Sequence, residues 1–178
     1  MKKNLILLCI VIITTGLLYL LVQYIKMTGF SFALALNFML MACVLTFTEA
    51  LKSEFNSPYF NEKTWEKKGK IYESFGIHFF RKLLVGIGWE KLNKKSKPVE
   101  KNVKALTYLH YRTKQDELGH LIIMLIVLGF TVYVAFRFGI LQSLWLMVLN
   151  ILLNVYPIFL QRYNRPRLER AMNLSKRR

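Results

Sequence analysis

The sequence predicts an all-α integral membrane protein with four transmembrane helices and a cytoplasmic loop that contains an amphipathic interfacial helix. Of the 178 residues, 54% are hydrophobic, and they gather in four long runs. Each run is close to the roughly 20 residues that a helix needs to cross the apolar core of a bilayer. The formal net charge is nevertheless +16. A soluble nucleic-acid-binding domain would share this charge but not the apolar runs, so we expect no nucleic-acid partner.

We expect one membrane domain over residues 1–178, with its basic residues on one side of the bilayer. Of the 26 lysines and arginines, 24 lie in the N-terminal tail, the loop 51–117 and the C-terminal tail 161–178. The other two, Lys26 and Arg137, lie in the short connections. Because cytoplasmic segments carry the excess of Lys and Arg, this pattern predicts a plasma-membrane protein with both termini and the loop in the cytoplasm. The predicted transmembrane segments are 4–25, 29–50, 118–136 and 140–160.

The loop 51–117 contains the predicted interfacial helix. Apolar residues recur every four positions and form one stripe on a helix, at Ile71, Phe75, Phe79, Leu83 and Ile87. Ser74 and Arg81 lie off this stripe, which is typical of a helix that lies in the membrane surface. An alternative interpretation is a small cytoplasmic core packed under the bundle. The basic connector 91–104 is expected to lie near anionic headgroups.

The third predicted helix begins with a carboxylate and a histidine. Glu117 and His120 are three positions apart and therefore share a helix face. A carboxylate beside a histidine can orient its ring, as a general base that deprotonates a hydroxyl requires. Alternatively, the pair only caps the helix among the headgroups. The same spacing also occurs in metal sites of helical bundles. A dinuclear site would need more inward carboxylates, and only Glu49 is well placed, so we expect no metal.

The fourth predicted helix ends in amides and arginines. Asn154 and Gln161 are seven positions apart and share a face, and Pro157 between them removes a backbone hydrogen bond. Arg162 and Arg165 follow at the cytoplasmic end. Arginines at this position can hold phosphates or stabilise a developing oxyanion. An alternative interpretation is that the basic tail only anchors the chain to lipid headgroups.

Three blocks between roughly residues 60 and 168 form a recognisable pattern. They are Trp65-Glu66-Lys67-Lys68-Gly69-Lys70, Thr113-Lys114 with Glu117 and His120, and Asn154-Val155 with Gln161-Arg162-Tyr163-Asn164-Arg165-Pro166-Arg167-Leu168. With these blocks the chain resembles the glycosyl-4,4'-diaponeurosporenoate acyltransferases, which are small membrane proteins of carotenoid biosynthesis. The last block is the most specific of the three.

The resemblance implies transfer of a fatty acyl group to a hydroxyl of a glycosylated carotenoid, the step that completes a staphyloxanthin-type pigment. The partners would be membrane lipids, a glycosylated lipid acceptor and an activated acyl donor. The donor is expected to be an acyl thioester, which acts as a co-substrate, and no cofactor is expected. The resemblance supplies the positions of the site, and the chemistry suggests the roles. We expect His120 to act as the base on the sugar hydroxyl and Glu117 to orient it.

The remaining positions of the pattern are expected to bind substrate. Arg162 and Arg165 would contact the donor's phosphates or the oxyanion, while Asn154 and Gln161 would position the acyl carbonyl or the sugar. Two other hypotheses stay open: a non-catalytic lipid-binding or scaffold protein, and an enzyme that acylates a different glycolipid. The expected substrate-binding residues are Asn154, Gln161, Arg162, Asn164, Arg165 and Arg167.

Overall fold

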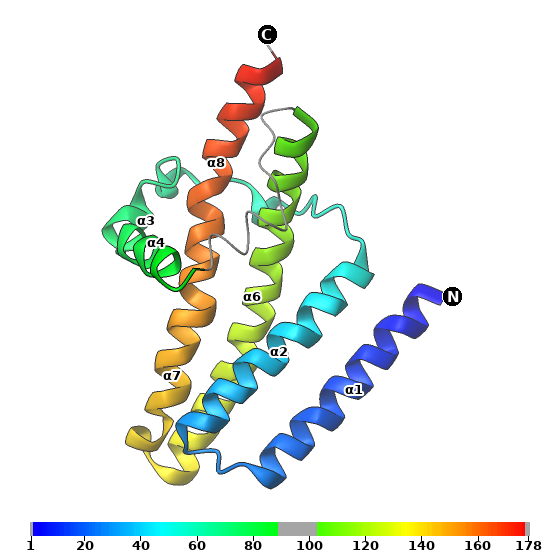
Figure 1. Cartoon of the computed structure of the whole chain (residues 1–178), viewed down its shortest axis with the longest axis vertical. Helices are drawn as coiled ribbons and strands as arrows, with labels where there is room; N and C mark the ends of the chain where they lie inside the picture. Colours follow the sequence, from blue (N-terminus) through cyan, green and yellow to red (C-terminus); the bar gives the residue numbers. More distant parts are fainter. Residues whose placement is uncertain (1, 89–102, 177–178) are drawn as a thin grey trace. The chain divides into compact units, whose positions relative to one another are not determined.

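The computed structural model describes residues 2–88 and 103–176, and its regular elements are helices (Figure 1). Within these two ranges no strand occurs, and four helices are long and apolar enough to cross a membrane. The predicted all-α class with four such helices is therefore confirmed. These helices are α1 (Lys2–Tyr24), α2 (Phe30–Leu51), α6 (Val103–Phe138) and the run Ile140–Lys176.

Two of the helices continue well beyond the predicted apolar spans. α6 begins at Val103 instead of residue 118, and the last helical run continues to Lys176 instead of ending at residue 160. Hydropathy marks where apolar side chains end, whereas backbone hydrogen bonding continues into polar sequence that contains good helix formers. Part of the predicted loop and most of the predicted tail are therefore helical.

The last helical run changes its hydrogen-bonding pattern along its length. It consists of the 3-10 turn η3 (Ile140–Ser143), α7 (Leu144–Asn150), the π-helical turn η4 (Ile151–Val155) and α8 (Tyr156–Lys176). Pro157 is the second residue of α8, two positions after the end of the π turn. A proline ring clashes with the carbonyl four residues earlier in a regular α-helix, and the wider π turn relieves that crowding. Asn154 lies in this turn and is fully buried.

The chain divides into two compact units, which we call the first and second units. The first consists of Met1–Ser53 and Leu118–Pro157, and the second of Glu54–Glu117 and Ile158–Arg178. The backbone crosses from one unit to the other three times: between Ser53 and Glu54, within α6 and within α8. Each unit is described separately below.

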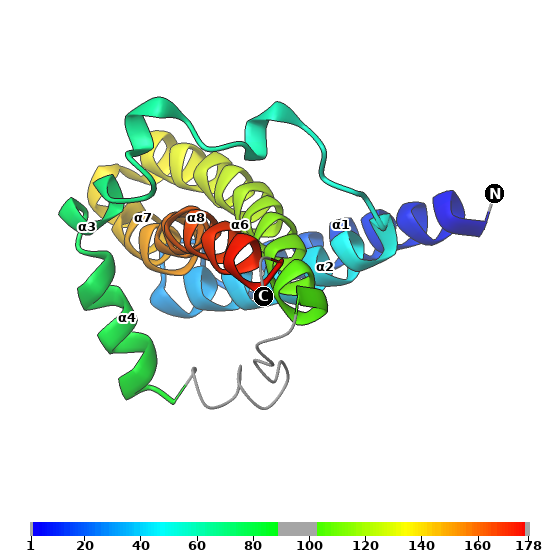
Figure 2. The same cartoon turned by 90° about the horizontal axis from the view of Figure 1, so that it is seen from above.

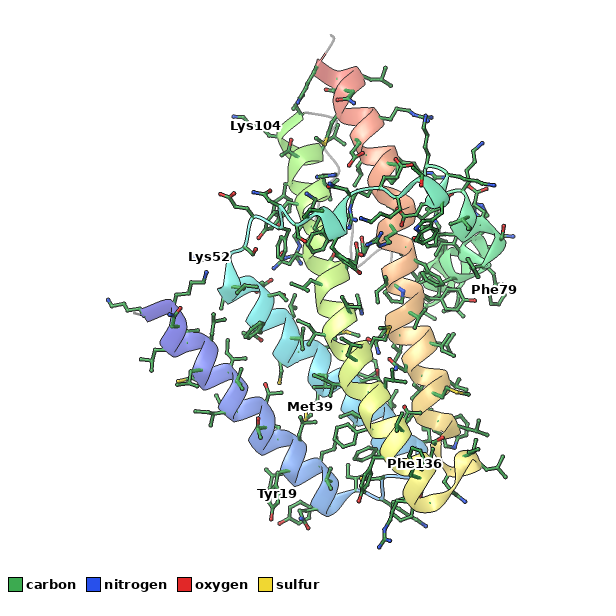
Figure 3. The ribbon with its side chains drawn as sticks, turned by 180° about the vertical axis from the view of Figure 1, so that it is seen from behind. Tyr19, Met39, Lys52, Phe79, Lys104 and Phe136 are labelled. Carbon is green, nitrogen blue, oxygen red and sulfur yellow. The ribbon has the colours of Figure 1, made fainter. Side chains whose placement is uncertain are left out.

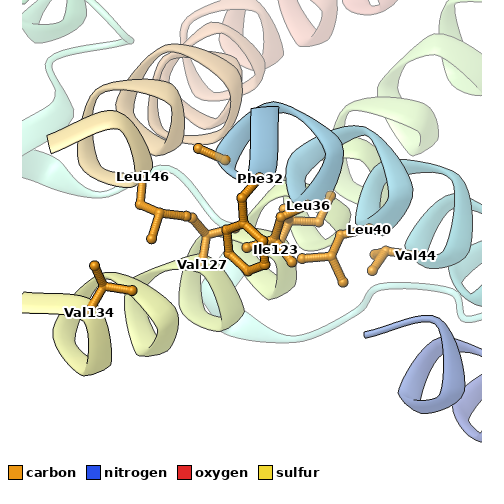
Figure 4. Packing of buried hydrophobic residues seen from close by; sticks show 9 residues of the cluster. Phe32, Leu36, Leu40, Val44, Ile123, Val127, Val134 and Leu146 are labelled. Carbon is orange, nitrogen blue, oxygen red and sulfur yellow. The ribbon is translucent and has the colours of Figure 1, made fainter. Parts of the chain in front are cut away.

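The first unit is a helical bundle with an apolar core between α2, α6 and α7. α1 lies beside α2 in two views (Figures 1 and 2) and buries none of its residues. Tyr19 on α1 illustrates this, since its side chain is 64% exposed (Figure 3). An apolar helix that its own protein leaves uncovered is suited to contact with lipid. The core residues, most of them labelled in Figure 4, are Phe32, Ala33, Leu36, Leu40, Val44, Ile123, Val127, Val134 and Leu146.

The second unit is built around α8, which lies between the first half of α6 and the α3–α4 pair (Figures 1 and 2). Aromatic rings join these elements. The rings of Tyr72 and Phe75 pack against Phe159 on α8, with centroid separations of 5.2 and 5.5 Å. The short elements of the unit are η1 (Pro58–Phe60), η2 (Thr64–Glu66), α3 (Ile71–Ser74) and α4 (Ile77–Gly86).

The predicted interfacial segment 71–87 is amphipathic, but it is not one continuous helix. α3 and α4 are separated at Gly76, whose φ of 75° lies in the left-handed region that glycine adopts easily. On α4, Ile77 and Phe80 are buried, whereas Phe79 is 71% exposed and lies on the outer side of the helix (Figure 3). Leu83 is exposed as well. Most of the basic connector 91–104 lies outside the described residues.

Candidate functional site

Two hydrogen-bonded groups contain most of the predicted site residues. The first lies in the second unit and consists of Glu66, Thr113, Glu117, Arg162 and Arg165; we call it the arginine–glutamate network. The other lies in the first unit and consists of His120, Asn154, Asn37 and Asn150; we call it the amide chain.

Glu117 is the centre of the arginine–glutamate network. Its side chain is 0% exposed, and its two carboxylate oxygens accept hydrogen bonds from different arginines. Arg162 Nε donates to Glu117 Oε1 at 2.7 Å, and Arg165 Nη2 donates to Glu117 Oε2. A buried carboxylate requires such partners, because an unpaired charge away from water costs several kcal/mol.

Arg162 joins α8 to α6 and to the loop before α3. Besides Glu117, it donates from Nη1 to Glu66 Oε1 at 2.7 Å and from Nη2 to the carbonyl of Tyr59 at 2.9 Å. The centre of its guanidinium lies 4.7 Å from the centroid of the Tyr59 ring, within cation–π range. All three guanidinium nitrogens therefore have an acceptor within the protein.

Arg165 makes a second set of bonds, one turn further along α8. Nη1 donates to the carbonyl of Phe60 at 2.9 Å. Nε donates to Thr113 Oγ1 at 3.2 Å, and Nη2 donates to the Thr113 carbonyl at 3.3 Å as well as to Glu117. The planar fork of an arginine can reach several acceptors at fixed angles, which the single nitrogen of a lysine cannot do.

Glu66 completes the network, and the sequence alone predicts no individual role for it. It accepts hydrogen bonds from the Lys63 backbone N–H and the Tyr72 hydroxyl, each at 2.6 Å, in addition to Arg162. Burial alone would raise the pKa of the Glu66 carboxyl, but these donors more than offset it and hold the pKa below its usual range. Burial and the Glu66 carboxylate raise the pKa of Tyr72, so its hydroxyl stays protonated.

The turn after Glu66 brings the backbone against α8. Lys67, Lys68 and Gly69 have successive φ values of 48°, 57° and 81°. At Gly69, a Cβ would lie 3.1 Å from the carbonyl oxygen of Tyr163, so this position requires glycine on grounds of both space and conformation. The block Trp65–Lys70 that we identified in the sequence therefore forms a tight turn packed on α8.

Two arginines and two glutamates balance the charge of the network. Because each guanidinium nitrogen already bonds to the protein, the arrangement braces the η1–η2 segment, α6 and α8 against one another. In this arrangement the protein itself takes up three of the five guanidinium hydrogens of Arg162 and four of those of Arg165. The carboxylate of Glu117 is likewise occupied by the two arginines.

The amide chain contains the predicted base. His120 on α6 is partly buried, and its Nδ1 lies 3.4 Å from Oδ1 of Asn154. Asn154 Nδ2 donates to Oδ1 of Asn37 at 2.7 Å and to Oδ1 of Asn150 at 2.9 Å. Asn37 and Asn150 are not among the site residues that the sequence predicts, although amides are rare within the apolar predicted spans.

The structure therefore brings together three of the four residues predicted to form one pocket: Glu117, Arg162 and Arg165. His120 shares α6 with Glu117, as predicted, and meets Asn154 through Nδ1. Gln161 and Asn164 are partly buried on α8 and, in the described part of the chain, belong to neither group.

The last predicted substrate-binding residue, Arg167, lies at the surface of the second unit, with its side chain 42% exposed. It donates to the carbonyl of Tyr163 at 2.6 Å and to Glu73 at 3.0 Å, and it stacks on the Tyr163 ring at 3.5 Å. Within residues 2–88 and 103–176, no three His, Cys, Asp or Glu side chains are arranged so that they could hold a metal ion.

One comparison with known proteins identifies the family. The family model CrtO, described as glycosyl-4,4'-diaponeurosporenoate acyltransferase, matches residues 56–174, which is well over half of the chain. The chain belongs to this acyltransferase family. The match confirms the resemblance seen in the sequence, and it contains the whole arginine–glutamate network together with His120, Asn150 and Asn154. α1, α2 and therefore Asn37 lie outside it. No curated protein and no solved structure matches the chain significantly.

The family description points to acyl transfer in a carotenoid pathway, and the four apolar helices indicate a membrane protein. Both substrates of such a reaction carry long apolar chains.

Proposed function

We propose that the chain is a plasma-membrane enzyme that transfers a fatty acyl group from an acyl thioester to a sugar hydroxyl of a glycosylated carotenoid or a similar glycolipid. Both termini and the second unit would lie on the cytoplasmic side, where the thioester is supplied. The observation that carries this proposal is the acyltransferase family match over residues 56–174. The partly buried His120 supplies a base of the kind that the reaction needs.

In the proposed reaction, His120 takes the proton of the sugar hydroxyl as the hydroxyl oxygen attacks the carbonyl carbon of the thioester. The tetrahedral intermediate then collapses, the carbon–sulfur bond breaks, and the thiolate leaves with the proton that the imidazolium returns. The products are an ester and a free thiol. A positioned base typically accelerates such a step by about 10²–10⁴-fold. Asn154 supports this role, since its side-chain oxygen faces the His120 ring.

The arginine–glutamate network has a different part in this proposal. Glu117, Arg162 and Arg165 hold the second unit in shape. Arg167, Gln161 and Asn164 are the remaining family-motif side chains of α8, and they are proposed to contact the acceptor sugar or the donor.

The experiment uses purified full-length protein in lipid nanodiscs with a fatty acyl thioester and a glycosylated carotenoid acceptor. We expect the wild-type chain to form the ester, and we expect His120→Ala to lower kcat by about 10²–10⁴-fold without loss of the folded protein. His78→Ala is the matched control, because His78 is half exposed on α4 and lies outside the amide chain. Full activity of His120→Ala would refute the assignment of the base.

The acceptor is tested in the same assay with a glucosylated diacylglycerol in place of the carotenoid. A preference for the carotenoid would support the narrower substrate. Equal turnover of both would support the broader glycolipid acyltransferase. Folded wild-type protein that turns over neither acceptor would contradict the enzyme hypothesis in favour of a lipid-binding or scaffold protein.

A further inference from the structure

The amide chain contains two asparagines whose orientation is determined by backbone carbonyls. Asn37 Nδ2 donates to the carbonyl of Ala33 at 2.8 Å, and Asn150 Nδ2 donates to the carbonyl of Met124 at 3.1 Å. A carbonyl oxygen can only accept a hydrogen bond, so in each asparagine the NH₂ group must face the backbone. The side-chain oxygens of Asn37 and Asn150 therefore point away from those carbonyls.

Both of these oxygens face Asn154. Its NH₂ group has two hydrogens, and it donates one to Asn37 Oδ1 at 2.7 Å and one to Asn150 Oδ1 at 2.9 Å. If the Asn154 amide were flipped, its oxygen would meet two other oxygens with no hydrogen between them. Asn37 and Asn154 are 0% exposed and Asn150 is 6% exposed, so water does not compensate such a contact.

The orientation of Asn154 determines which nitrogen of His120 carries the proton. With its NH₂ group committed to Asn37 and Asn150, Asn154 presents Oδ1 to His120 Nδ1 at 3.4 Å. An amide oxygen has no proton to give, so Nδ1 must be the donor. Neutral His120 is then protonated at Nδ1, and Nε2 has the lone pair. This tautomer is the opposite of the one that a histidine side chain favours in water.

We propose that Asn37 and Asn150 are positioning residues that act through Asn154 to hold His120 in its Nδ1–H tautomer, so that Nε2 is the nitrogen that accepts the substrate proton. The inference rests on the proposed function for its catalytic consequence, but the tautomer itself does not depend on it. It also extends the site to α2, because Asn37 is on that helix. α2 lies outside the matched residues 56–174. Once protonated, the ring keeps the same Nδ1–H bond to Asn154, so the amides need not rearrange during the reaction.

A purely structural role for the amides makes a different prediction. Buried amides on facing helices also stabilise bundles in lipid through interhelical hydrogen bonds. In that case their loss would weaken the fold and leave the tautomer of His120 unchanged. A measurement of the tautomer therefore distinguishes positioning from packing.

The experiment is ¹⁵N NMR of the full chain in lipid nanodiscs with labelled histidine, near pH 8, where an ordinary histidine with a pKa of about 6.5 is neutral. His78→Gln and His110→Gln leave His120 as the only labelled histidine of the three in the chain. We expect this parent protein to be protonated at Nδ1. In Asn37→Leu/Asn150→Leu, Asn154 is free to turn its NH₂ group to the ring, and we expect Nε2–H to become the major tautomer.

The matched control is Thr131→Val. Thr131 is buried in the first unit and donates to the carbonyl of Val127, so its loss removes one buried hydrogen bond outside the amide chain. We expect His120 in Thr131→Val to have the same tautomer as in the parent protein. If the double variant does not fold, Asn37→Leu and Asn150→Leu are measured singly, and each should raise the Nε2–H fraction above that of Thr131→Val. An Nε2–H parent, or variants with the parent's tautomer, would overturn the inference.

Turnover links the tautomer to the reaction. kcat should be proportional to the fraction of protein that keeps the Nδ1–H tautomer. A ninefold excess of Nε2–H leaves one tenth in that form and should lower kcat about tenfold at unchanged KM. The two proposals fail separately. An active His120→Ala enzyme would overturn the role of His120 as base and leave the NMR result standing. An Nε2–H ring in an active enzyme would overturn only the tautomer lock.

Discussion

Glu117 shows how a carboxylate can be buried on a long helix when two arginines offset the cost of removing it from water. Its side chain is 0% exposed, yet Arg162 and Arg165 neutralise it from α8. Removing one member of such a buried group leaves the others unpaired, which is costlier than never having formed the group.

We therefore predict that Glu117→Gln acts mainly on stability. Gln keeps the shape of the side chain but turns an NH₂ group toward a guanidinium, and breaking a buried ion pair costs about 3–5 kcal/mol. At roughly 2–4 °C per kcal/mol for a chain of this size, the melting temperature of the detergent-solubilised protein should fall by on the order of 10 °C.

Glu73→Gln is the matched control for this substitution. Glu73 also pairs with an arginine of α8, Arg167, but the two side chains are 39% and 42% exposed. Surface pairs contribute only about 0–1 kcal/mol. Equal melting temperatures for Glu117→Gln and Glu73→Gln would contradict a structural role of the network.

Residue spacing predicted only part of these groups. The three-residue interval correctly placed Glu117 and His120 on the same helix. Spacing carries no information about partners that are distant in sequence, such as Arg162 and Glu66, which are 96 positions apart, or Asn154 and Asn37, which are 117 apart. The resemblance partly compensated, because Glu66, Thr113, Glu117, Arg162 and Arg165 all lie in its three blocks.

Among the elements, the tight turn before α3 depends on one glycine. Gly69 has a φ of 81°, and a Cβ there would lie 3.1 Å from the Tyr163 carbonyl oxygen and 3.2 Å from the Tyr163 Cα. We predict that Gly69→Ala destabilises the second unit. The left-handed conformation alone costs about 1–2 kcal/mol for a residue with a Cβ, and the contact with the α8 backbone adds to it.

Gly86→Ala is the matched control, because the same substitution is made at a position where the structure has room for a Cβ. Gly86 is the last residue of α4, and a Cβ there would meet nothing within 4 Å. Alanine in a helix is favoured over glycine by roughly 0.5–1 kcal/mol, so this variant should melt at the same temperature as the wild-type protein or higher. A Gly69→Ala protein as stable as Gly86→Ala would show that the turn is not held against α8.

The α3–α4 segment presents an apolar face that the described protein does not cover. Phe75 and Phe79 are 52% and 71% exposed, and Ser74 and Arg81 are exposed too. Because the protein leaves all four positions exposed, a difference in their accessibility to aqueous quenchers must come from contact with lipid. We predict that spin labels at 75 and 79 are shielded from aqueous quenchers in nanodiscs, while labels at 74 and 81 stay accessible, because apolar stripes on interfacial helices enter the acyl boundary.

As a control, the same labels are measured in short-chain detergent micelles instead of lipid. The two native cysteines are replaced before labelling. Equal accessibility at all four positions in nanodiscs would contradict the interfacial helix. The structure differs from the sequence-based prediction here in one respect: the left-handed Gly76 breaks the segment. A periodic apolar pattern reports which faces are buried and does not report where a glycine interrupts the backbone.

Hydropathy located the four long helices correctly because apolar length is what a bilayer selects. It missed where α6 begins and where the last helical run ends, since Val103–Asp116 and the residues after 160 are polar yet helical. The π turn at Ile151–Val155 was likewise beyond hydropathy, although Pro157 indicated an irregularity in that helix.

At the scale of the whole molecule, different interactions hold the two units. The first unit combines an apolar core with the buried amide chain, and apolar burial alone drives helix association only weakly in lipid. The second unit has aromatic contacts and the arginine–glutamate network, which suit a water-facing unit at a membrane surface. This contrast agrees with the charge distribution, since 21 of the 26 basic residues belong to the second unit and five to the first.

The proposed topology gives the final prediction. α1 and α2 are joined by a short connection that contains Lys26, and Gly139, with a φ of 103°, turns the chain between α6 and the last helical run. Each connection should therefore lie on the outer side, opposite the basic loop and tail. Paired reporters, one active outside and one active in the cytoplasm, are fused after residues 28 and 138 and within 92–104. The first two sites should read as external and the third as cytoplasmic. An external reading within 92–104 would place the second unit on the wrong side for a cytoplasmic thioester and would contradict the proposed arrangement of the reaction.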